Sequence, residues 1–453
     1  MEGGHLIPSD FTIILLCLDI SLKRPKERFV MSHSSEDYRL RTRFIIKLGR
    51  ALHRCGANSV RIEEHLGNVT EMLGLHGSFL VSPTTFTYIF WLDDELDQFT
   101  HIERMELSDY DLGRLWAIDQ LVEKMEDGHV DFESGLQKLE KLGQCPPPTP
   151  FFENALASLV TGGAFATLLS ANPLDAIAAS LISFLLFLIG HFTESKKGFK
   201  PALAITLAFT AGVLAMMFFT FGAGINAPIV ILASIIIHIP GLALTVALEE
   251  ISHGHLISGC SRLVDGLMTL LKLFFGTLAG IAVVNFVSPV PSEPSLLLSP
   301  VPDWRIWPAL IGLAISLGIA FKIPRNKWAL GVVSVFIAFG AAKLGGHLFG
   351  MYAGMFLGAL SVGLFSNLFA RLTNGPCSIL LIQGIIVLVP GSKVYSILNH
   401  WVSGEAILPS ESGGRALIAS SPSSRASSFP TPSPLQRKLC SGKILDFHYT
   451  YFL

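Results

Sequence analysis

Residues 238–259 of the chain read HIPGLALTVALEEISHGHLISG, and this stretch decides the fold. It is apolar enough to enter a bilayer, yet Pro240-Gly241 interrupts it and acidic and histidine residues follow. Proline removes a backbone donor and clashes with the preceding turn, while glycine adds conformational freedom, so the pair predicts a break in the helix. The sequence therefore predicts a membrane span that is broken within its length.

The composition of the whole chain agrees with a membrane protein. Its 453 residues are 50% hydrophobic and 15% charged, with a mean hydropathy of +0.53, whereas soluble proteins carry about 25% charged residues. The formal net charge of -2 gives no reason to expect a nucleic-acid partner. The six cysteines stand singly, without a CxxC pair, so we expect neither a disulfide framework nor a metal site, and no cofactor.

Long apolar runs separated by short polar turns extend from residue 151 to residue 401. About nine of them approach the roughly 20 residues that a bilayer requires. We predict spans near 153–170, 174–190, 201–222, 227–248, 263–287, 306–322, 328–344, 348–370 and 377–398. The proline-rich stretch 288–304 divides them into a first transmembrane repeat, 151–290, and a second, 305–403.

The remaining segments have different compositions. Residues 37–145 predict a small cytosolic α+β domain, in which TTFTYIFWL (84–92) is rich enough in β-branched and aromatic residues to form a strand. Residues 1–36 predict a disordered extension or an over-long start, with Met31 as the alternative start to Met1. Residues 408–453 are rich in Ser and Pro and predict a disordered tail.

A repeat explains the interrupted span. Pro240-Gly241 and Pro390-Gly391 lie 150 residues apart, each in the fourth span of its half. Corresponding Pro/Gly-interrupted spans in two halves indicate a transport site, because unwound backbone can bind ions or substrate. The alternative is that both prolines only kink packed helices. The residues that we predict to bind substrate are Pro240, Gly241, Thr245, Pro390, Gly391 and Ser392.

The number of spans predicts how the repeats are related. A unit of five spans is odd, so its second copy is inverted in the membrane. The fifth span, 263–287, has no apolar partner after residue 401. The predicted fold is therefore an α-helical polytopic membrane protein of two five-helix-type inverted repeats, with the last helix missing, preceded by the α+β domain.

Six ionisable residues near these spans are candidates for proton coupling, because charges at membrane depth are costly and usually functional. For the acidic and histidine residues after the break, the alternative is a solvated helix end. Lys272 could instead extend its amine to the membrane surface, and a carbonyl could satisfy His238. The candidates are His238, Glu249, Glu250, His253, Asp265 and Lys272.

The loops predict the orientation, since Lys and Arg gather on the cytoplasmic side. If the N-terminal domain is cytoplasmic, most of the basic loop residues lie on its side: Lys196, Lys197, Lys200, Arg262, Lys322, Arg325, Lys327 and Arg371. The opposite side receives Arg305, Lys343 and Lys393.

Three stretches resemble the threonine/serine exporter family: LGRALHRCGANSVRIEEHL (48–66), PGLALTVALEEISHGHLISGCSRL (240–263) and GIIVLVPGS (384–392). The resemblance runs from about residue 41 to residue 403. It implies a cytosolic N-terminal domain and about ten spans. The family includes split relatives implicated in dicarboxylate export and fungal pheromone-regulated membrane proteins. The first thirty residues and those after about 407 depart from the pattern.

We therefore expect a secondary transporter that exports small polar metabolites, threonine or serine, with coupling to protons. It would be multi-pass in the plasma membrane or a bacterial inner membrane, with an amino acid or dicarboxylate, protons and the bilayer as partners; a homo-oligomer stays open. The alternatives are a dicarboxylate exporter, or a membrane-anchored sensor or hydrolase. No G-x-S-x-G or H-E-x-x-H motif favours an enzyme.

Overall fold

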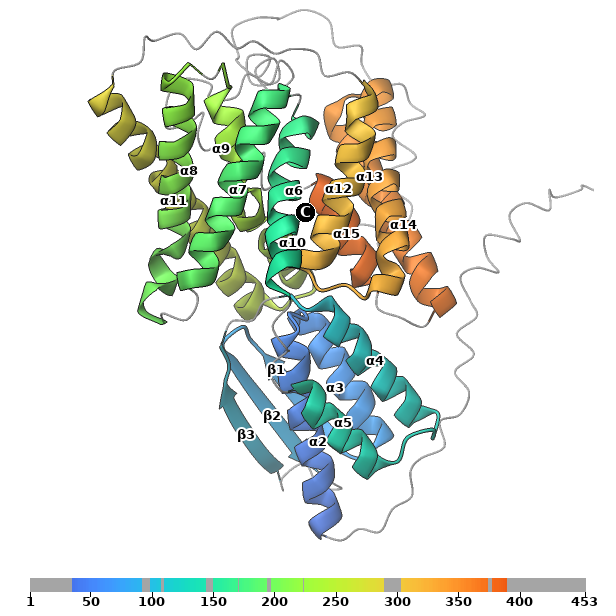
Figure 1. The fold of residues 1–453 in the computed structure, drawn as a ribbon. Helices are drawn as coiled ribbons and strands as arrows, with labels where there is room; N and C mark the ends of the chain where they lie inside the picture. The colour runs from blue at the N-terminus through green and yellow to red at the C-terminus, as the bar shows by residue number, and fades with distance from the viewer. Residues whose placement is uncertain are drawn as a thin grey trace, which may run out of the picture.

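The computed structural model describes residues 35–91, 98–106, 110–143, 150–169, 171–193, 197–222, 224–288, 303–373 and 377–388. The first three ranges form an N-terminal domain, and the helices that follow residue 150 stand together on one end of it (Figure 1). Residues 1–34 of the predicted N-terminal extension, Pro390, Gly391 and Ser392, and the Ser/Pro-rich tail lie outside the described residues, whereas residues 35 and 36 begin α2.

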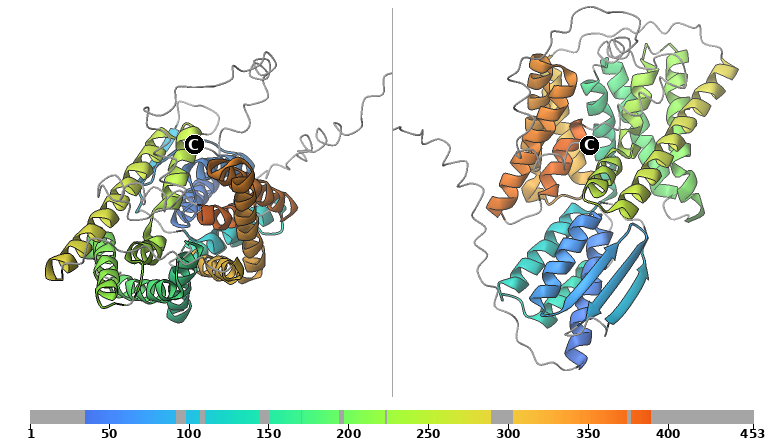
Figure 2. Two further views of the ribbon diagram at one scale, coloured as in Figure 1. Left: turned by 90° about the horizontal axis from the view of Figure 1, so that it is seen from above. Right: turned by 180° about the vertical axis from the view of Figure 1, so that it is seen from behind.

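The N-terminal domain is an α+β unit, as the sequence predicts. Its antiparallel sheet has the strand order β1 (His76–Val81), β2 (Thr85–Trp91), β3 (Gln98–Arg104). Along β2, Phe86, Tyr88 and Phe90 alternate with more exposed residues and are buried against the helices that cover one face of the sheet (Figure 2). The helices are α2 (Ser35–Arg54), α3 (Ser59–Met72), α4 (Leu112–Glu126) and α5 (Phe132–Gly143).

Two of these helices begin at the face of the domain that meets the membrane part. Asn58 caps α3 by accepting a hydrogen bond from the Arg61 amide (2.9 Å), and Asp111 caps α4 by accepting one from the Arg114 amide (3.0 Å). Each cap side chain accepts a hydrogen bond from the amide three residues later. The other amides of the first turn can therefore bond partners outside the helix. Both helices use this freedom, as described below.

The membrane part consists of helices that overlap all nine predicted spans, although the structure describes the last of these, 377–398, only as far as residue 388. The first half holds α6 (Phe151–Leu168), α7 (Pro173–Thr193), α8 (Lys200–Thr220), α9 (Ala227–Ile235), α10 (Gly241–Ser252) and α11 (Leu256–Val287). The second half holds α12 (Ile306–Ala320), α13 (Trp328–Phe349), α14 (Met351–Thr373) and α15 (Ser378–Leu388).

Length and composition single out the helices that can cross a membrane. Within the described residues, five are long and apolar enough, namely α7, α8, α11, α13 with the short turn before it, and α14. The bent pair of α9 and α10 makes a sixth, while α12 and α15 are apolar but shorter. These features confirm a polytopic membrane protein.

Corresponding helices of the two halves run in opposite directions. α6 begins at the end near the N-terminal domain, where Glu153 pairs with Arg325, whereas α12 ends there, at a carbonyl that bonds the Leu112 amide. Between them, the Thr161 hydroxyl bonds the Ser316 hydroxyl at 2.9 Å. These two residues are 155 positions apart, as are the first residues of α6 and α12. The bond therefore joins equivalent positions of two inverted repeats.

Glycines allow the closest helix crossings. A Cβ at Gly276 of α11 would lie 2.4 Å from the Ile205 carbonyl oxygen of α8, and one at Gly354 of α14 would lie 2.4 Å from the Ala342 carbonyl oxygen of α13. Membrane helices associate through such small residues, because lipid gives no hydrophobic drive to bring them together.

Candidate functional site

The predicted break in the fourth span is present. α9 continues as a short 3₁₀ turn, Ile236–His238, before Ile239 becomes extended and α10 begins at Gly241, bent by 55° from the first piece. Pro240 precedes α10 and forms no side-chain cap bond. The first-turn amides of Leu242 and Ala243 therefore have no acceptor within the helix. The break leaves backbone donors without helical acceptors inside a span, which is the arrangement that the sequence predicts.

The contacts at its two ends show that this segment passes through the whole membrane part. At the end far from the N-terminal domain, the Asn226 amide donates to Asp175 at the start of α7 (2.6 Å). At the near end, α10 meets α3 of the domain through Glu250. The helical pieces on either side of the break are of similar length, so the break lies near the middle.

Glu250 is the most enclosed of the predicted residues. Its side chain is 0% exposed, and its Oε1 accepts the Ser59 amide at the start of α3 (2.9 Å) while its Oε2 accepts the Ser258 hydroxyl (3.0 Å). Arg262 of α11 bonds both oxygens, at 3.2 and 3.3 Å. The alternative of a solvated helix end is therefore wrong for Glu250, because the N-terminal domain covers it.

Neighbouring groups extend this contact. The Asn58 side chain forms a hydrogen bond with the carboxylate of Glu249. The Ser59 hydroxyl forms one with the Ser258 hydroxyl. The His255 ring lies 3.5 Å from the Glu63 carboxylate of α3. The domain thus contacts the end of the broken span through charged, amide and hydroxyl groups.

The other predicted residues do not join this cluster. His238 is half-buried beside the break, and the Thr245 hydroxyl donates to the Gly241 carbonyl one turn into α10 (3.1 Å). His253 is exposed and caps α10, as the solvated alternative expects. Asp265 is exposed on α11, and Lys272 is half-buried with no carboxylate in salt-bridge contact among the described residues. Whether any of these residues binds substrate or protons stays a prediction.

Because α11 has 32 residues, it is about 48 Å long, well beyond the roughly 30 Å of a hydrocarbon core. Asp265 lies ten residues into the helix on the side of the domain. Its charge therefore need not sit at membrane depth, which weakens the case for a coupling role. Lys272 lies at the middle of the helix, where that case is stronger.

A second polar cluster, which the sequence analysis missed, lies inside the domain next to the membrane part. Arg61 of α3 pairs with Asp119 of α4 and also donates to the Ser378 hydroxyl at the start of α15 (3.3 Å). Burial raises the pKa of Asp119 to about 6, despite the neighbouring guanidinium. Burial and then the charge of Arg61 lower the pKa of His65, whose ring is 3.7 Å from Asp119, to about 4.

No local signal in the sequence marks these partners. Ser59 and Glu250 are 191 residues apart, and Arg61 and Ser378 are 317 apart. Among the described residues, no group of three His, Cys, Asp or Glu side chains could hold a metal ion.

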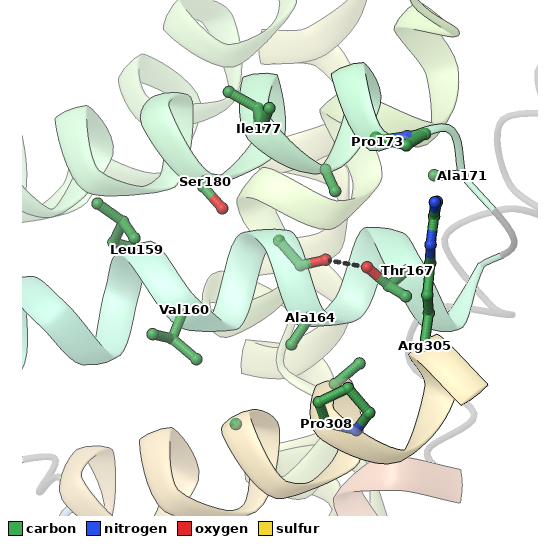
Figure 3. A pocket seen from close by; sticks show the side chains of 14 residues that line it. Leu159, Val160, Ala164, Thr167, Ala171, Pro173, Ile177, Ser180, Arg305 and Pro308 are labelled. Carbon is green, nitrogen blue, oxygen red and sulfur yellow. Dashed lines mark hydrogen bonds between the residues drawn. The ribbon is translucent and has the colours of Figure 1, made fainter. Parts of the chain in front are cut away.

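A groove of about 510 Å³ lies elsewhere, between α6, α7 and α12 (Figure 3). Its lining is largely apolar, Thr167 bonds its own helix, and Arg305 extends toward Ala171 and Pro173 at one end. None of the predicted site residues lines it. The predicted substrate site at the break is therefore separate from this groove, and it stays a prediction.

Comparison with known proteins agrees with the architecture. Residues 43–284 match the family model described as "Putative threonine/serine exporter", and residues 308–421 match the one described as "Threonine/Serine exporter, ThrE". No solved structure matches the chain.

Two curated relatives illustrate the range of similar proteins. A "Pheromone-regulated membrane protein 10" from Yarrowia lipolytica is 22% identical over 410 residues, which cover 84% of this chain and 32% of the relative. A "Probable threonine/serine exporter" from Mycobacterium tuberculosis is 22% identical over 311 residues, 63% of this chain and 55% of the relative. The chain thus spans about a third to a half of the length of the relatives it matches. Since the first family model covers more than half of the chain, the protein belongs to the threonine/serine exporter family of membrane proteins.

Proposed function

We propose that this protein is a secondary transporter that exports threonine or serine and that its substrate binds at the break between α9 and α10. The observation that carries the proposal is the 55° bend at Pro240, with free first-turn amides behind it. In secondary transporters, half-helix N-termini bind substrate carboxylates and unwound carbonyls bind cations. An α-amino acid has one group of each kind.

The chemistry of the break fits such a zwitterion. The carboxylate would accept hydrogen bonds from Leu242 and Ala243 at the positive end of α10. The ammonium group would lie against the carbonyls that end the 3₁₀ turn before Ile239. The Thr245 hydroxyl donates to the Gly241 carbonyl one turn back, and its oxygen would accept a hydrogen bond from the hydroxyl of the substrate.

Proton coupling is the finer part of the proposal. His238 is the titratable side chain nearest in sequence to the break, and Glu249 lies two turns beyond it on α10. A group that couples protons to transport must meet the substrate path, which favours His238 over the exposed His253 and Asp265. We expect His238→Gln to remove the response of transport to a pH gradient.

The orientation that we propose puts the N-terminal domain in the cytoplasm. Lys322, Arg325, Lys327 and Arg371 lie at the ends of helices beside the domain, and positive charge gathers on the cytoplasmic side. Export would then carry substrate from the side of the domain to the far side.

Counterflow in proteoliposomes tests the function. Vesicles loaded with unlabelled threonine should accumulate labelled threonine or serine, and an imposed pH gradient should change the rate. Accumulation of labelled succinate without threonine or serine would reassign the substrate to dicarboxylates. A protein that accumulates none of the three would contradict the proposal.

A further inference from the structure

The N-terminal domain contacts both repeats, and the two contacts differ in kind. We call its contact with the second repeat the seam: Asp111, Leu112, Gly113 and Trp116 of the domain against Phe321, Lys322, Lys327 and Phe369. Within its contact with the first repeat, we call one polar set the latch: Asn58, Ser59 and Glu63 of the domain against Glu249, Glu250, His255 and Ser258. In Figure 1 and in the right view of Figure 2 the domain lies below the ends of both halves.

The seam is part of one hydrophobic core. Ile323, Phe369, Ile379, Leu380 and Ile382 of the second repeat are buried in the same cluster as the core of the domain. From the first repeat, among the described residues, half-buried Leu242 packs at the edge of this cluster. Most buried apolar residues of α6 to α11 belong to a second core, which also contains Leu313 and Leu317 of α12.

The seam is also close at the level of the backbone. The Leu112 amide donates to the Phe321 carbonyl (3.1 Å), and a Cβ at Gly113 would lie 2.5 Å from the Lys322 carbonyl oxygen. The Lys327 ammonium lies over the Trp116 ring, 4.8 Å from its centroid. Separation here would expose apolar side chains to water, and its free energy would grow with the exposed area.

The latch is polar. Its bonds join the Ser59 amide to Glu250, the Ser59 and Ser258 hydroxyls, Asn58 to Glu249, and Glu63 to His255. Water can replace each of these bonds at small net cost. Glu250 would not lose its counter-charge, because Arg262 and Ser258 belong to the first repeat and move with it.

We propose that the N-terminal domain moves with the second repeat as one body and that the latch opens whenever the broken span is exposed to the side of the domain. The inference rests on the proposed transport function and adds to it a gate. The latch holds the last turn of α10, which is the second piece of the broken span. Transporters built of two repeats alternate by rocking one repeat against the other, and a closed latch would prevent that motion on this side.

Two amides of the native protein provide a matched test that needs no transport. Ser59 and Leu112 are the first residues of α3 and α4, each helix has a side-chain cap, and each amide bonds an acceptor in the membrane part. If the latch opens more often than the seam, hydrogen exchange at Ser59 will be faster than at Leu112, after correction for intrinsic rates. Equal protection of the two amides would overturn the proposal.

Cross-linking then tests the link to transport. In a cysteine-free background that transports, a thiol cross-link between Ser59→Cys and Ser258→Cys should reduce counterflow to the level of empty vesicles, and reductive cleavage should restore it. The control, Trp116→Cys with Lys327→Cys, cross-links the seam and should keep transport. Transport that continues across a closed latch, or that stops with a closed seam, would contradict the gate. If the native protein performs no counterflow, the proposed function fails, and the exchange measurement still decides whether the latch opens.

Discussion

At the scale of single residues, Glu250 is a buried carboxylate with a complete set of donors. Arg262 supplies two bonds, Ser258 one, and the first amide of α3 one. Desolvating a buried ion costs several kcal/mol. An oppositely charged partner offsets this cost only where further hydrogen bonds satisfy the remaining donors and acceptors of the pair. The two residues of this pair should therefore respond differently to substitution.

We predict that Arg262→Gln destabilises the protein by about 3–5 kcal/mol, because it leaves the fully buried carboxylate of Glu250 without its counter-charge. Glu250→Gln should cost less, about 1–3 kcal/mol, since the Arg262 side chain is 17% exposed and can turn toward water. The double variant should be more stable than Arg262→Gln alone. Thermal unfolding in detergent measures all three, and a double variant no better than Arg262→Gln would contradict the account.

Asp119 and His65 predict a pH dependence of stability with opposing signs. The pKa of Asp119 is raised to about 6 from 3.8, so its contribution to stability is lost as the pH rises from about 4 to about 6. The pKa of His65 is lowered to about 4 from 6.5, so its contribution is lost as the pH falls from 6.5 to about 4. In the native protein the two groups therefore change the free energy of unfolding in opposite directions as the pH changes.

Single variants should therefore show the pH dependence of stability that each group contributes by itself. Asp119→Asn should make the unfolding temperature fall as the pH is lowered from 6.5 to 4, and His65→Gln should make it rise over the same range. The unfolding temperature of each variant across this range is the measurement. The same slope in both variants would show that burial does not shift these groups as described.

Single-residue properties were the least predictable from the sequence. The pattern around residues 249–255 allowed both a proton relay and a solvated helix end. Whether Glu250 is solvated depends on Ser59, which is remote in sequence and contacts Glu250 across the interface between the domain and the membrane part. Burial of a charge is decided by tertiary contacts, and no local pattern encodes it.

At the scale of secondary-structure elements, the broken span is the feature on which the proposed transport depends. We predict that Pro240→Ala makes α9 and α10 more continuous, keeps the protein folded and abolishes counterflow, since the free amides of the break would find helical acceptors. Pro228→Ala is the control, because Pro228 lies in the first turn of α9, where proline leaves the helix intact. It should retain transport.

The folded yield and the counterflow of both variants show whether Pro240 forms part of the transport site or only bends the helix. If Pro240→Ala transports like the native protein, the proline only bends the span, as the alternative from the sequence holds. Loss of folded protein with Pro240→Ala alone would assign the break to stability.

The crossing of α13 and α14 predicts a contrast between two glycines of one helix. A Cβ at Gly354 would lie 2.4 Å from a carbonyl oxygen of α13, whereas one at Gly363 meets nothing within 4 Å. Gly354→Ala should force the helices apart and lower the unfolding temperature, and Gly363→Ala should be neutral or slightly stabilising. Equal effects of the two substitutions would contradict the observed crossing.

The elements of the membrane part were predictable because long apolar runs and the Pro-Gly break are local signals. In the domain, β2 was predictable from its aromatic and β-branched residues. β1 (HGSFLV) and β3 (QFTHIER) were missed, because glycine and polar residues dilute their pattern. They form strands because both pair along β2. Pairing with the neighbouring strand stabilises them, and their own composition does not.

At the scale of the whole molecule, the inverted arrangement follows from the spacing of the two Pro-Gly pairs and the odd number of spans in a unit. The Thr161–Ser316 bond between equivalent positions supports it. The position of the domain across both repeats could not be predicted, since the seam joins residues about 200 positions apart. The second break, at Pro390-Gly391, stays a prediction.

The central claim is that threonine or serine binds at the break beside Pro240. Its most direct test is substrate protection of Thr245→Cys in a cysteine-free background that transports. The account predicts that threonine slows the reaction of this thiol with a small reagent, while an equal concentration of a non-substrate sugar does not. The same labelling rate with and without threonine, in a variant that still performs threonine counterflow, would contradict the claim and place the substrate elsewhere in the protein.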